Sequence, residues 1–137
     1  MIEVRFTDID SQGHANHLAI ASWISHSRVK LFDDAIQLAK MGNRWDHTMV
    51  HIDMDFMVEV TYPGIIGILP EVARIGGRSV TTKYEVHVMK DGKTGEAVAR
   101  ATCVNVFTCD GKPTRLPESL RDALANSENT AAFLCDM

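Results

Sequence analysis

One segment with apolar residues at helical spacing, followed by four strand patterns in a row, restricts the fold of this chain more than any other feature. The helical pattern extends from about residue 17 to about residue 41, and Gly42 is a natural stop after it. A helix of this length is long for a chain of 137 residues. It has to be the central element, and the strands that follow have to wrap around it.

The four strand patterns follow the helix directly, and the first of them, residues 50–60, is the clearest. Apolar and polar side chains alternate along it, which predicts a strand with one buried face. The other patterns cover residues 65–75, 80–88 and 96–107, and turn-forming residues separate them. Pro70 lacks a backbone donor, so the second strand is expected to have an edge or a bulge there. The apolar face of the first strand consists of Val50, Ile52, Met54, Phe56, Val58 and Val60.

Two shorter elements complete the expected fold. Residues 2–7 have the pattern of a strand, and residues 118–125 have that of a short helix. The predicted fold class is α+β: one domain over residues 1–125, with a long central helix wrapped by a curved, mainly antiparallel sheet. Residues 126–137 are weakly patterned and are expected to form a C-terminal tail, either disordered or docked.

The composition excludes several classes of protein. Hydrophobic residues make up 45% and charged residues 23%, as in soluble globular domains. A net charge of −4 argues against a nucleic-acid-binding protein, which usually has a basic stripe. We see no apolar run of membrane-spanning length and no secretory signal pattern. The three cysteines, Cys103, Cys109 and Cys135, have no C-x-x-C spacing, so we expect reduced thiols and a cytoplasmic location.

The segment before the long helix carries the candidate chemistry. Asn16 is a good N-cap, and capping leaves further backbone N–H groups at the helix start unpaired. Acidic side chains stand a few residues away. A carboxylate can activate a nucleophile while free N–H groups polarise a carbonyl, which suits acyl transfer. The segment is Asp8-Ile9-Asp10-Ser11-Gln12-Gly13-His14-Ala15-Asn16-His17.

This D-x-D-x-x-G-H-x-N segment resembles that of the hotdog-fold acyl-CoA thioesterases, within the 4-hydroxybenzoyl-CoA thioesterase-like branch. Residues 74–79 are similar to the R-I-G-x-x-S segment of that family, and residues 110–117 are similar to its C-terminal signature. The resemblance covers about residues 2–122. It implies a single hotdog domain that assembles into a homodimer or homotetramer with active sites between subunits.

The resemblance implies hydrolysis of an acyl-CoA thioester, with coenzyme A as part of the substrate and no other cofactor. Asp10 is the expected general base or nucleophile, and backbone amides near His17 are the expected oxyanion donors. Many members have asparagine where this chain has His17, whereas one subgroup has a histidine seven residues after the aspartate. That subgroup has tyrosine in place of Phe6. The His17 ring is expected either to orient the substrate or assist a proton transfer, as a catalytic residue, or to pack at the interface.

The turn between the second and third predicted strands is the expected CoA-binding segment. Glycine lets the backbone approach a ligand closely, and arginine suits phosphate geometry. Without the resemblance, an ordinary turn with an exposed arginine would explain the segment as well. The expected substrate- and CoA-binding residues are Asn16, Gly76, Gly77, Arg78 and Ser79.

The remaining candidates have structural explanations. Asp8 is expected to pair with Arg5 or to brace the loop, and His14 to bond within the loop. The spacing of acids and histidines does not support a metal site, and no G-x-S-x-G motif is present. Two alternatives stay open, namely a thioesterase acting on acyl-carrier protein and a non-catalytic protein that binds acyl-CoA. A hydratase is disfavoured by chain length and histidine placement.

Overall fold

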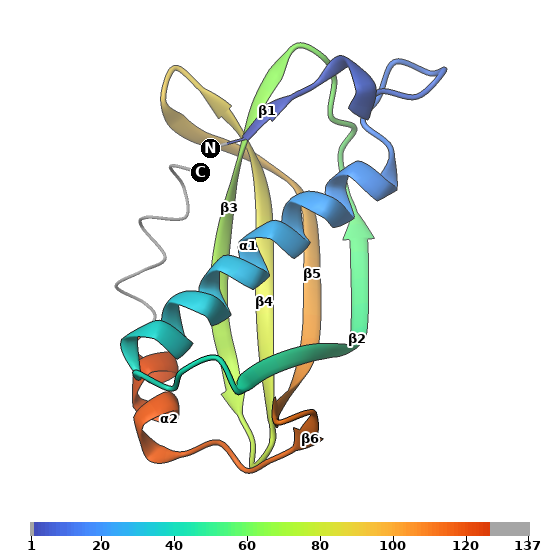
Figure 1. Ribbon diagram of the computed structural model, residues 1–137. Coiled ribbons are helices and arrows are strands. Elements are labelled where there is room, and N and C mark those ends of the chain that lie inside the picture. Colours follow the sequence, from blue (N-terminus) through green and yellow to red (C-terminus); the bar gives the residue numbers. More distant parts are fainter. Residues whose placement is uncertain (1, 127–137) are drawn as a thin grey trace.

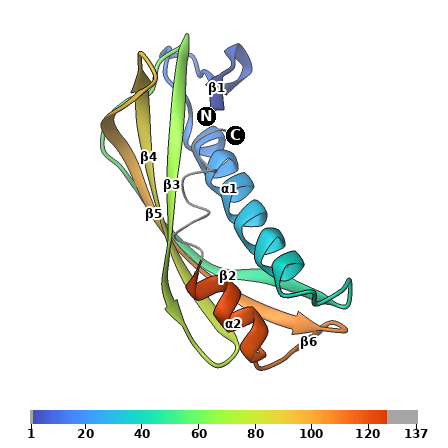
Figure 2. The ribbon, with the colours of Figure 1, turned by 90° about the vertical axis from the view of Figure 1, so that its left-hand side faces the viewer.

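A long helix lies across the concave face of a curved sheet in the computed structural model, which describes residues 2–126 (Figures 1 and 2). This arrangement confirms the predicted α+β hotdog fold. The elements are β1 (Ile2–Val4), the 3₁₀ helix η1 (Phe6–Asp8), α1 (His17–Leu38), β2 (Trp45–Phe56), β3 (Gly64–Ile75), β4 (Ser79–Lys90), β5 (Lys93–Cys109), β6 (Lys112–Pro113) and α2 (Glu118–Ala125).

The sheet is antiparallel, with the strand order β1-β3-β4-β5-β2 and with the short β6 paired to β5. The long β2 therefore forms one edge of the sheet. The other edge is formed by β1 at one end and by β3 along the rest, because β1 pairs with β3 only from Gly64 to Ile66. Pro70 lies on the part of β3 that β1 leaves uncovered, so it stands on an edge of the sheet, as the sequence predicted.

The apolar core lies between α1 and the sheet in two clusters. The first contains Ile20 and Ile24 of α1 with Ile66 and Val86 of the sheet. The second lies toward the C-terminal half of α1, where α2 closes the end of the sheet (Figure 2). Its fully buried side chains are Phe32, Val80, Phe107, Leu116, Leu120 and Leu124.

Two elements are shorter than the sequence predicted. The expected strand 2–7 ends at Val4, because the Asp8 carboxylate accepts a hydrogen bond from Arg5 N (2.8 Å) and turns the chain into η1. Helix α1 ends at Leu38 rather than near residue 41. Lys40 adopts a positive φ of 56°, and the N–H of Met41 donates to the carbonyl of Ile36 (3.1 Å), which closes the helix before Gly42.

Strand β2 differs most from its prediction, because it begins at Trp45 and has a bulge between Met49 and His51. The bulge places Val50 in the solvent, at 60% exposure, and Figure 1 shows the strand bending at this level. The strand ends at Phe56, since the N–H groups of Met57 and Val58 both donate to one carbonyl, that of Val98. The prediction of one strand with a single buried face over residues 50–60 is therefore wrong.

The predicted C-terminal tail, residues 126–137, and Cys135 within it lie outside the described residues, except for Asn126 at the end of α2. Within residues 2–126, no helix has the length and apolar character needed to cross a membrane.

Candidate active site

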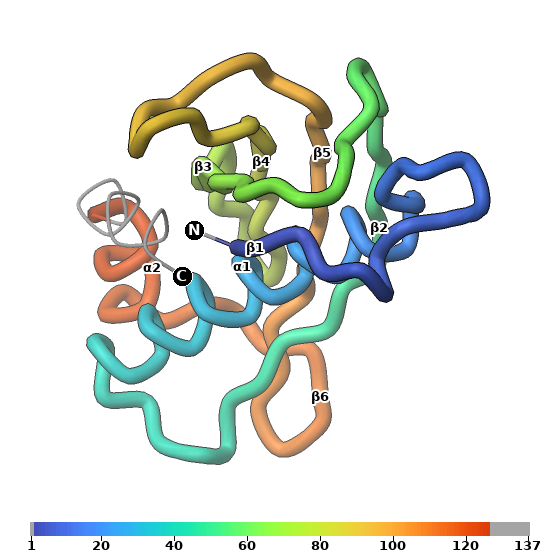
Figure 3. Tube along the Cα trace, turned by 90° about the horizontal axis from the view of Figure 1, so that it is seen from above, coloured from blue at the N-terminus to red at the C-terminus, as the bar shows by residue number. Residues whose placement is uncertain are grey.

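The predicted catalytic segment forms a loop between η1 and the start of α1, and the loop projects beside one end of β2 (Figure 3). Its shape is set by backbone bonds: Asp10 N donates to His14 O (2.9 Å), and Gly13 N donates to Asp10 O (3.1 Å). Gly13 has a φ of 81°, a conformation that favours glycine. The loop is therefore a compact turn that presents its side chains at the helix N-terminus.

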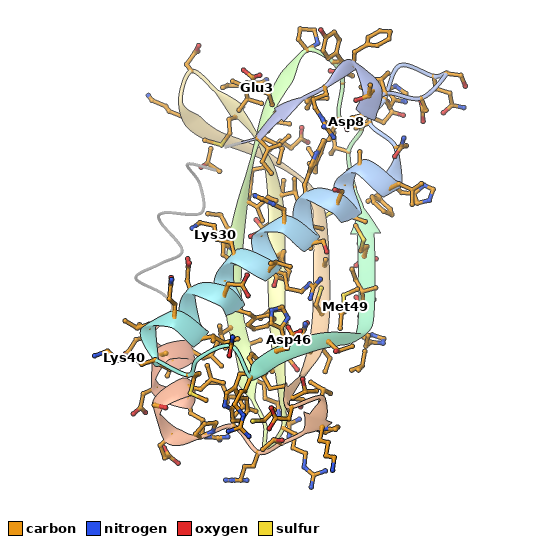
Figure 4. All side chains as sticks on the ribbon, in the orientation of Figure 1. Glu3, Asp8, Lys30, Lys40, Asp46 and Met49 are labelled. Carbon is orange, nitrogen blue, oxygen red and sulfur yellow. The ribbon has the colours of Figure 1, made fainter. Side chains whose placement is uncertain are left out.

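Asp8 holds this loop in place through contacts at the end of η1. It is 5% exposed, and its carboxylate accepts hydrogen bonds from the backbone N–H (2.8 Å) and the guanidinium (3.3 Å) of Arg5. Its carbonyl also accepts from Asn16 N (3.0 Å), which ties η1 to the start of α1. Figure 4 shows Asp8 next to the N-terminal end of α1. The prediction that Asp8 pairs with Arg5 and braces the loop is confirmed.

Asp10 is exposed and lines a cleft of about 320 Å³. One carboxylate oxygen, Oδ1, accepts hydrogen bonds from the N–H groups of Gln12 (2.9 Å) and His14 (3.3 Å). The other oxygen, Oδ2, has no hydrogen-bond partner among the described residues. Asp10 therefore stabilises the turn with one oxygen and leaves the second for a ligand.

The N-terminus of α1 lies in the same cleft. Asn16 caps the helix, because its Oδ1 accepts from Ala19 N (2.8 Å), and Ile20 N donates to the Asn16 carbonyl (3.3 Å). In the part of the chain that the structure describes, the N–H groups of His17 and Leu18 have no acceptor. They stand at the positive end of the helix dipole, so a carbonyl oxygen placed there would be polarised.

The His17 ring lies at the wall of this cleft, against β2. It packs edge to face with the Phe56 ring, with centroids 6.5 Å apart and an interplanar angle of 71°. Phe56 is itself 52% exposed, so this wall of the cleft is apolar and open. Phe56 is a site residue that the sequence did not reveal, because its alternation pattern marked it for the core.

Glu59 is the other residue that the sequence analysis missed. The backbone of His14 bonds within the loop, as expected, but its ring Nε2 lies 3.0 Å from Oε2 of Glu59. Glu59 follows the end of β2 and lines the same cleft as Asp10. Only the early end of β2 brings it there, since a strand over residues 50–60 would have placed Glu59 on the outer face.

The turn between β3 and β4, residues 76–79, lies at the opposite end of the sheet from the loop between η1 and α1 that carries Asp10, so one chain does not bring the two together (Figure 1). Gly76 N donates to Ser79 O (2.7 Å), and a Cβ on Gly76 would lie 3.0 Å from Ser79 Oγ. The Arg121 guanidinium donates to the Gly76 carbonyl (2.7 Å), and Leu116 N donates to that of Gly77 (2.9 Å). The glycines thus permit a tight turn packed against the C-terminal segment.

Several basic side chains gather around this turn, although they are distant in sequence. Arg78 is exposed, and Arg115 Nη1 lies 3.4 Å from where a Cβ on Gly77 would be. With Arg121 and the turn itself, they form a surface that we call the basic turn. Its cationic groups suit an anionic ligand such as a phosphate. Arg115 and Arg121 were not among the predicted residues, because no local pattern links them to residues 76–79.

No group of three or more histidine, cysteine, aspartate or glutamate side chains within residues 2–126 is arranged to hold a metal ion.

Comparison with known proteins agrees with this architecture. The sequence profile of the thioesterase-like superfamily matches residues 4–124. No curated protein matches the chain. The structure resembles the PA5185 protein from Pseudomonas aeruginosa strain PAO1, with 29% identity, a TM-score of 0.73, and coverage of 90% of this chain and 86% of the other.

Two other solved structures share the fold. One is a thioesterase from Thermus thermophilus complexed with coenzyme A and Zn, with 23% identity, a TM-score of 0.77, and coverage of 93% of this chain and 92% of the other. The second is a DHNA-CoA thioesterase from Staphylococcus aureus, with 18% identity, a TM-score of 0.72, and coverage of 96% of this chain and 89% of the other.

Proposed function

Because the chain belongs to the thioesterase-like superfamily, we propose that it hydrolyses an acyl-CoA thioester to a free acid and coenzyme A. The cleft at the start of α1 is the observation that carries this proposal. It combines the free Oδ2 of Asp10 with the unpaired N–H group of His17, and the unpaired N–H of Leu18 follows in the same first turn of α1. A carboxylate beside such donors is what attack on a thioester carbonyl requires.

In the proposed reaction, Asp10 accepts a proton from water as the water oxygen bonds to the thioester carbon. Direct attack by Asp10 on that carbon is the alternative route, and it would give an anhydride that water then hydrolyses. In both routes the carbonyl oxygen becomes negative and accepts hydrogen bonds from the helix N-terminus. Such a donor is worth roughly 3–4 kcal/mol in the transition state. The C–S bond then breaks, and CoA leaves as a thiolate.

We further propose that two copies pair through β2 to complete the site. The basic turn lies near the Trp45 end of β2, since Phe107 N donates to Arg78 O (2.9 Å) and Trp45 pairs with the nearby Cys109. A two-fold axis across the β2 edge would place the Trp45 end of one copy beside the Phe56 end of the other. The basic turn of one copy would then approach the catalytic loop of the other, where it could bind the phosphates of CoA.

The test is the change Asp10→Asn, assayed by thiol release from acyl-CoAs of several chain lengths. Asn keeps an oxygen for the turn but cannot accept the proton, so the rate should fall by roughly 10²–10⁴ while the melting temperature stays close to that of the wild type. Asp122→Asn, a position on α2 far from the cleft, is the matched control and should retain activity. Equal activity of Asp10→Asn and wild type would remove Asp10 from the mechanism.

An acyl-carrier protein is the second candidate donor of the acyl group. The basic turn favours it, because carrier proteins are acidic and a cationic rim would attract one. Measuring kcat/KM for the same acyl group on CoA and on carrier protein separates the two. A non-catalytic acyl-CoA-binding protein would instead bind both, release no thiol, and be unaffected by Asp10→Asn.

A further inference from the structure

A second hollow, a groove between α1 and β2, lies next to the catalytic cleft in the direction of the helix. It has a volume of about 420 Å³. The same two elements form both hollows. Helix α1 contributes His17 and Ile20 to the cleft and Ala21 and Ile24 to the groove. Strand β2 contributes Phe56 to the cleft and Met54 to the groove. We call this the acyl groove. Its lining is Leu18, Ala21, Ser22, Ile24, Ser25, Arg28, Met49, Ile52, Met54 and Cys103.

Arg28 is the one charged side chain among the described residues of this lining. It is 8% exposed, and its guanidinium donates one hydrogen bond, to Ser25 Oγ (2.9 Å). Its Nε is buried and has no hydrogen-bond partner among the described residues. Nor does any carboxylate within residues 2–126 lie within 4.0 Å of the guanidinium. A mostly buried charge without a counter-charge is costly, so an anion bound in the groove would stabilise Arg28.

Further polar groups lie on the sheet near Arg28. Cys103 of the groove pairs with Thr82 on one side and with Ile52 on the other, so Thr82 is the next residue across the sheet. The hydroxyls of Thr82 and Tyr84 are buried beside each other, and no hydrogen bond of good geometry satisfies either one within the described chain. Burial raises the pKa of Tyr84, so its hydroxyl keeps its proton and remains a donor. These hydroxyls lie on the sheet next to the groove, whose own walls are mainly apolar.

We propose that the acyl groove binds an acyl group that carries a carboxylate at its far end, with Arg28 as the residue that recognises it. This inference rests on the proposed thioesterase function and adds the class of substrate. Arg28 follows His17 by eleven positions, which is about 16 Å along the helix, and its guanidinium donates back to Ser25, toward the helix N-terminus. In the proposed complex the thioester would lie in the cleft, and the acyl chain would run along α1 so that its distal carboxylate lies in the groove.

The test compares thioesters of dicarboxylic acids with plain acyl thioesters of the same length: adipyl-, suberyl- and sebacyl-CoA against hexanoyl-, octanoyl- and decanoyl-CoA. At the length that reaches Arg28, the wild type should favour the carboxylated member in kcat/KM by roughly ten- to a hundredfold. Arg28→Met, which keeps the volume and removes the charge, should abolish or reverse this preference, mainly through KM. Arg28→Lys should retain part of it, because the charge remains but the planar fork is lost.

Lys30→Met is the matched control, since Lys30 lies on the same helix, pairs with Asp34 (3.3 Å) and is absent from the groove lining. Its substrate ratio should equal that of the wild type. The inference is overturned if the wild type shows no preference at any length, or if Arg28→Met leaves the ratio unchanged. Loss of self-association in Arg28→Met with an unchanged ratio would assign Arg28 to the subunit interface instead.

A binding measurement separates this inference from the proposed function. Isothermal titration of Asp10→Asn with sebacyl-CoA and decanoyl-CoA should show tighter binding of the carboxylated ligand, and Arg28→Met in that background should remove the difference. Hydrolysis of plain acyl-CoAs without any carboxylate preference would sink the inference and leave the thioesterase function intact. If the binding difference is present but no thioester is hydrolysed, the proposed thioesterase function fails and the recognition of a carboxylate by Arg28 stands.

Discussion

At the scale of single residues, two aspartates that stand two positions apart in the sequence have separate environments. Asp8 is buried and fully engaged with the backbone and guanidinium of Arg5, whereas Asp10 is exposed and uses only one oxygen to hold its turn. This difference favours Asp10 as the chemical group, because a base needs a free lone pair and access to solvent or substrate. Asp8 acts on the site indirectly, through the shape of the loop.

His47 is a second residue whose behaviour follows from its surroundings. Its side chain is 6% exposed and lies against the rings of Phe32 and Phe107, with centroids 4.9 and 5.8 Å away. Burial lowers the pKa of His47, and this effect outweighs the raising influence of Asp33, whose Oδ1 lies 3.5 Å from Nε2. The folded protein therefore holds this imidazole neutral more strongly than the unfolded chain does.

A pH dependence of stability follows from this pKa. The unfolded chain binds a proton at His47 below pH 6.5, its ordinary pKa, while the folded state resists protonation, so acidification favours unfolding. Urea unfolding at about pH 7.5 and about pH 5.5 should show a loss of stability that is smaller in His47→Phe. His26→Phe, at an exposed position of α1, should behave like the wild type. Identical losses in wild type and His47→Phe would contradict the prediction.

At the scale of elements, the N-terminus of α1 is where local sequence and site chemistry coincide. Asn16 satisfies the N–H of Ala19 with its side chain, while the N–H groups of His17, at the cleft, and of Leu18 have no acceptor in the described chain. Its own N–H donates to the carbonyl of Asp8, which fixes the entry angle of the chain. The same cap therefore stabilises the helix and positions the proposed oxyanion donors.

Replacing this cap should lower both stability and activity. Asn16→Ala removes the Oδ1 acceptor and should cost about 1 kcal/mol in the free energy of unfolding, measured with urea. Asn16→Ser keeps an acceptor and should remain close to the wild type. The initial rate of thiol release should fall in the alanine variant and largely persist in the serine variant. An alanine variant as stable as the serine variant would show that the cap is not needed.

At the scale of the whole molecule, β2 is an edge strand with apolar side chains left in solvent. Val50, Ile52 and Phe56 are all at least 37% exposed, and the strand has twelve residues, so its edge is long. Long apolar edges are normally covered or paired. This exposure supports the proposed pairing of two copies through β2.

A charge on this edge should therefore disrupt assembly. Val50→Lys places an ammonium at an exposed position, so the fold should persist while the mass measured by light scattering falls from that of a dimer to that of one chain. Thiol release should fall with it, because the basic turn would no longer approach the cleft. Thr94→Lys adds the same charge on the β4–β5 hairpin and should leave assembly unchanged. A monomeric, fully active wild type would end the proposal.

The features that depend on local sequence were predictable. The period of the apolar residues identified α1 and three of the four main strands, and the cap at Asn16 located the helix start, because these signals arise within one or two turns of chain. Asp8 and the turn over residues 76–79 were located correctly for the same reason. The thioesterase-like family was also readable from short motifs, and the profile match over residues 4–124 confirms it.

The remaining features depend on contacts between distant segments, and only the tertiary structure decided them. The bulge at Val50 arises from the register of β2 against β5, and it determines which β2 side chains face the helix. Glu59 and Phe56 reach the cleft because β2 ends early, and Arg115 reaches Gly77 through the packing of the C-terminal segment. The burial of Arg28 has the same origin, since a helix residue becomes enclosed only when the sheet curls around it.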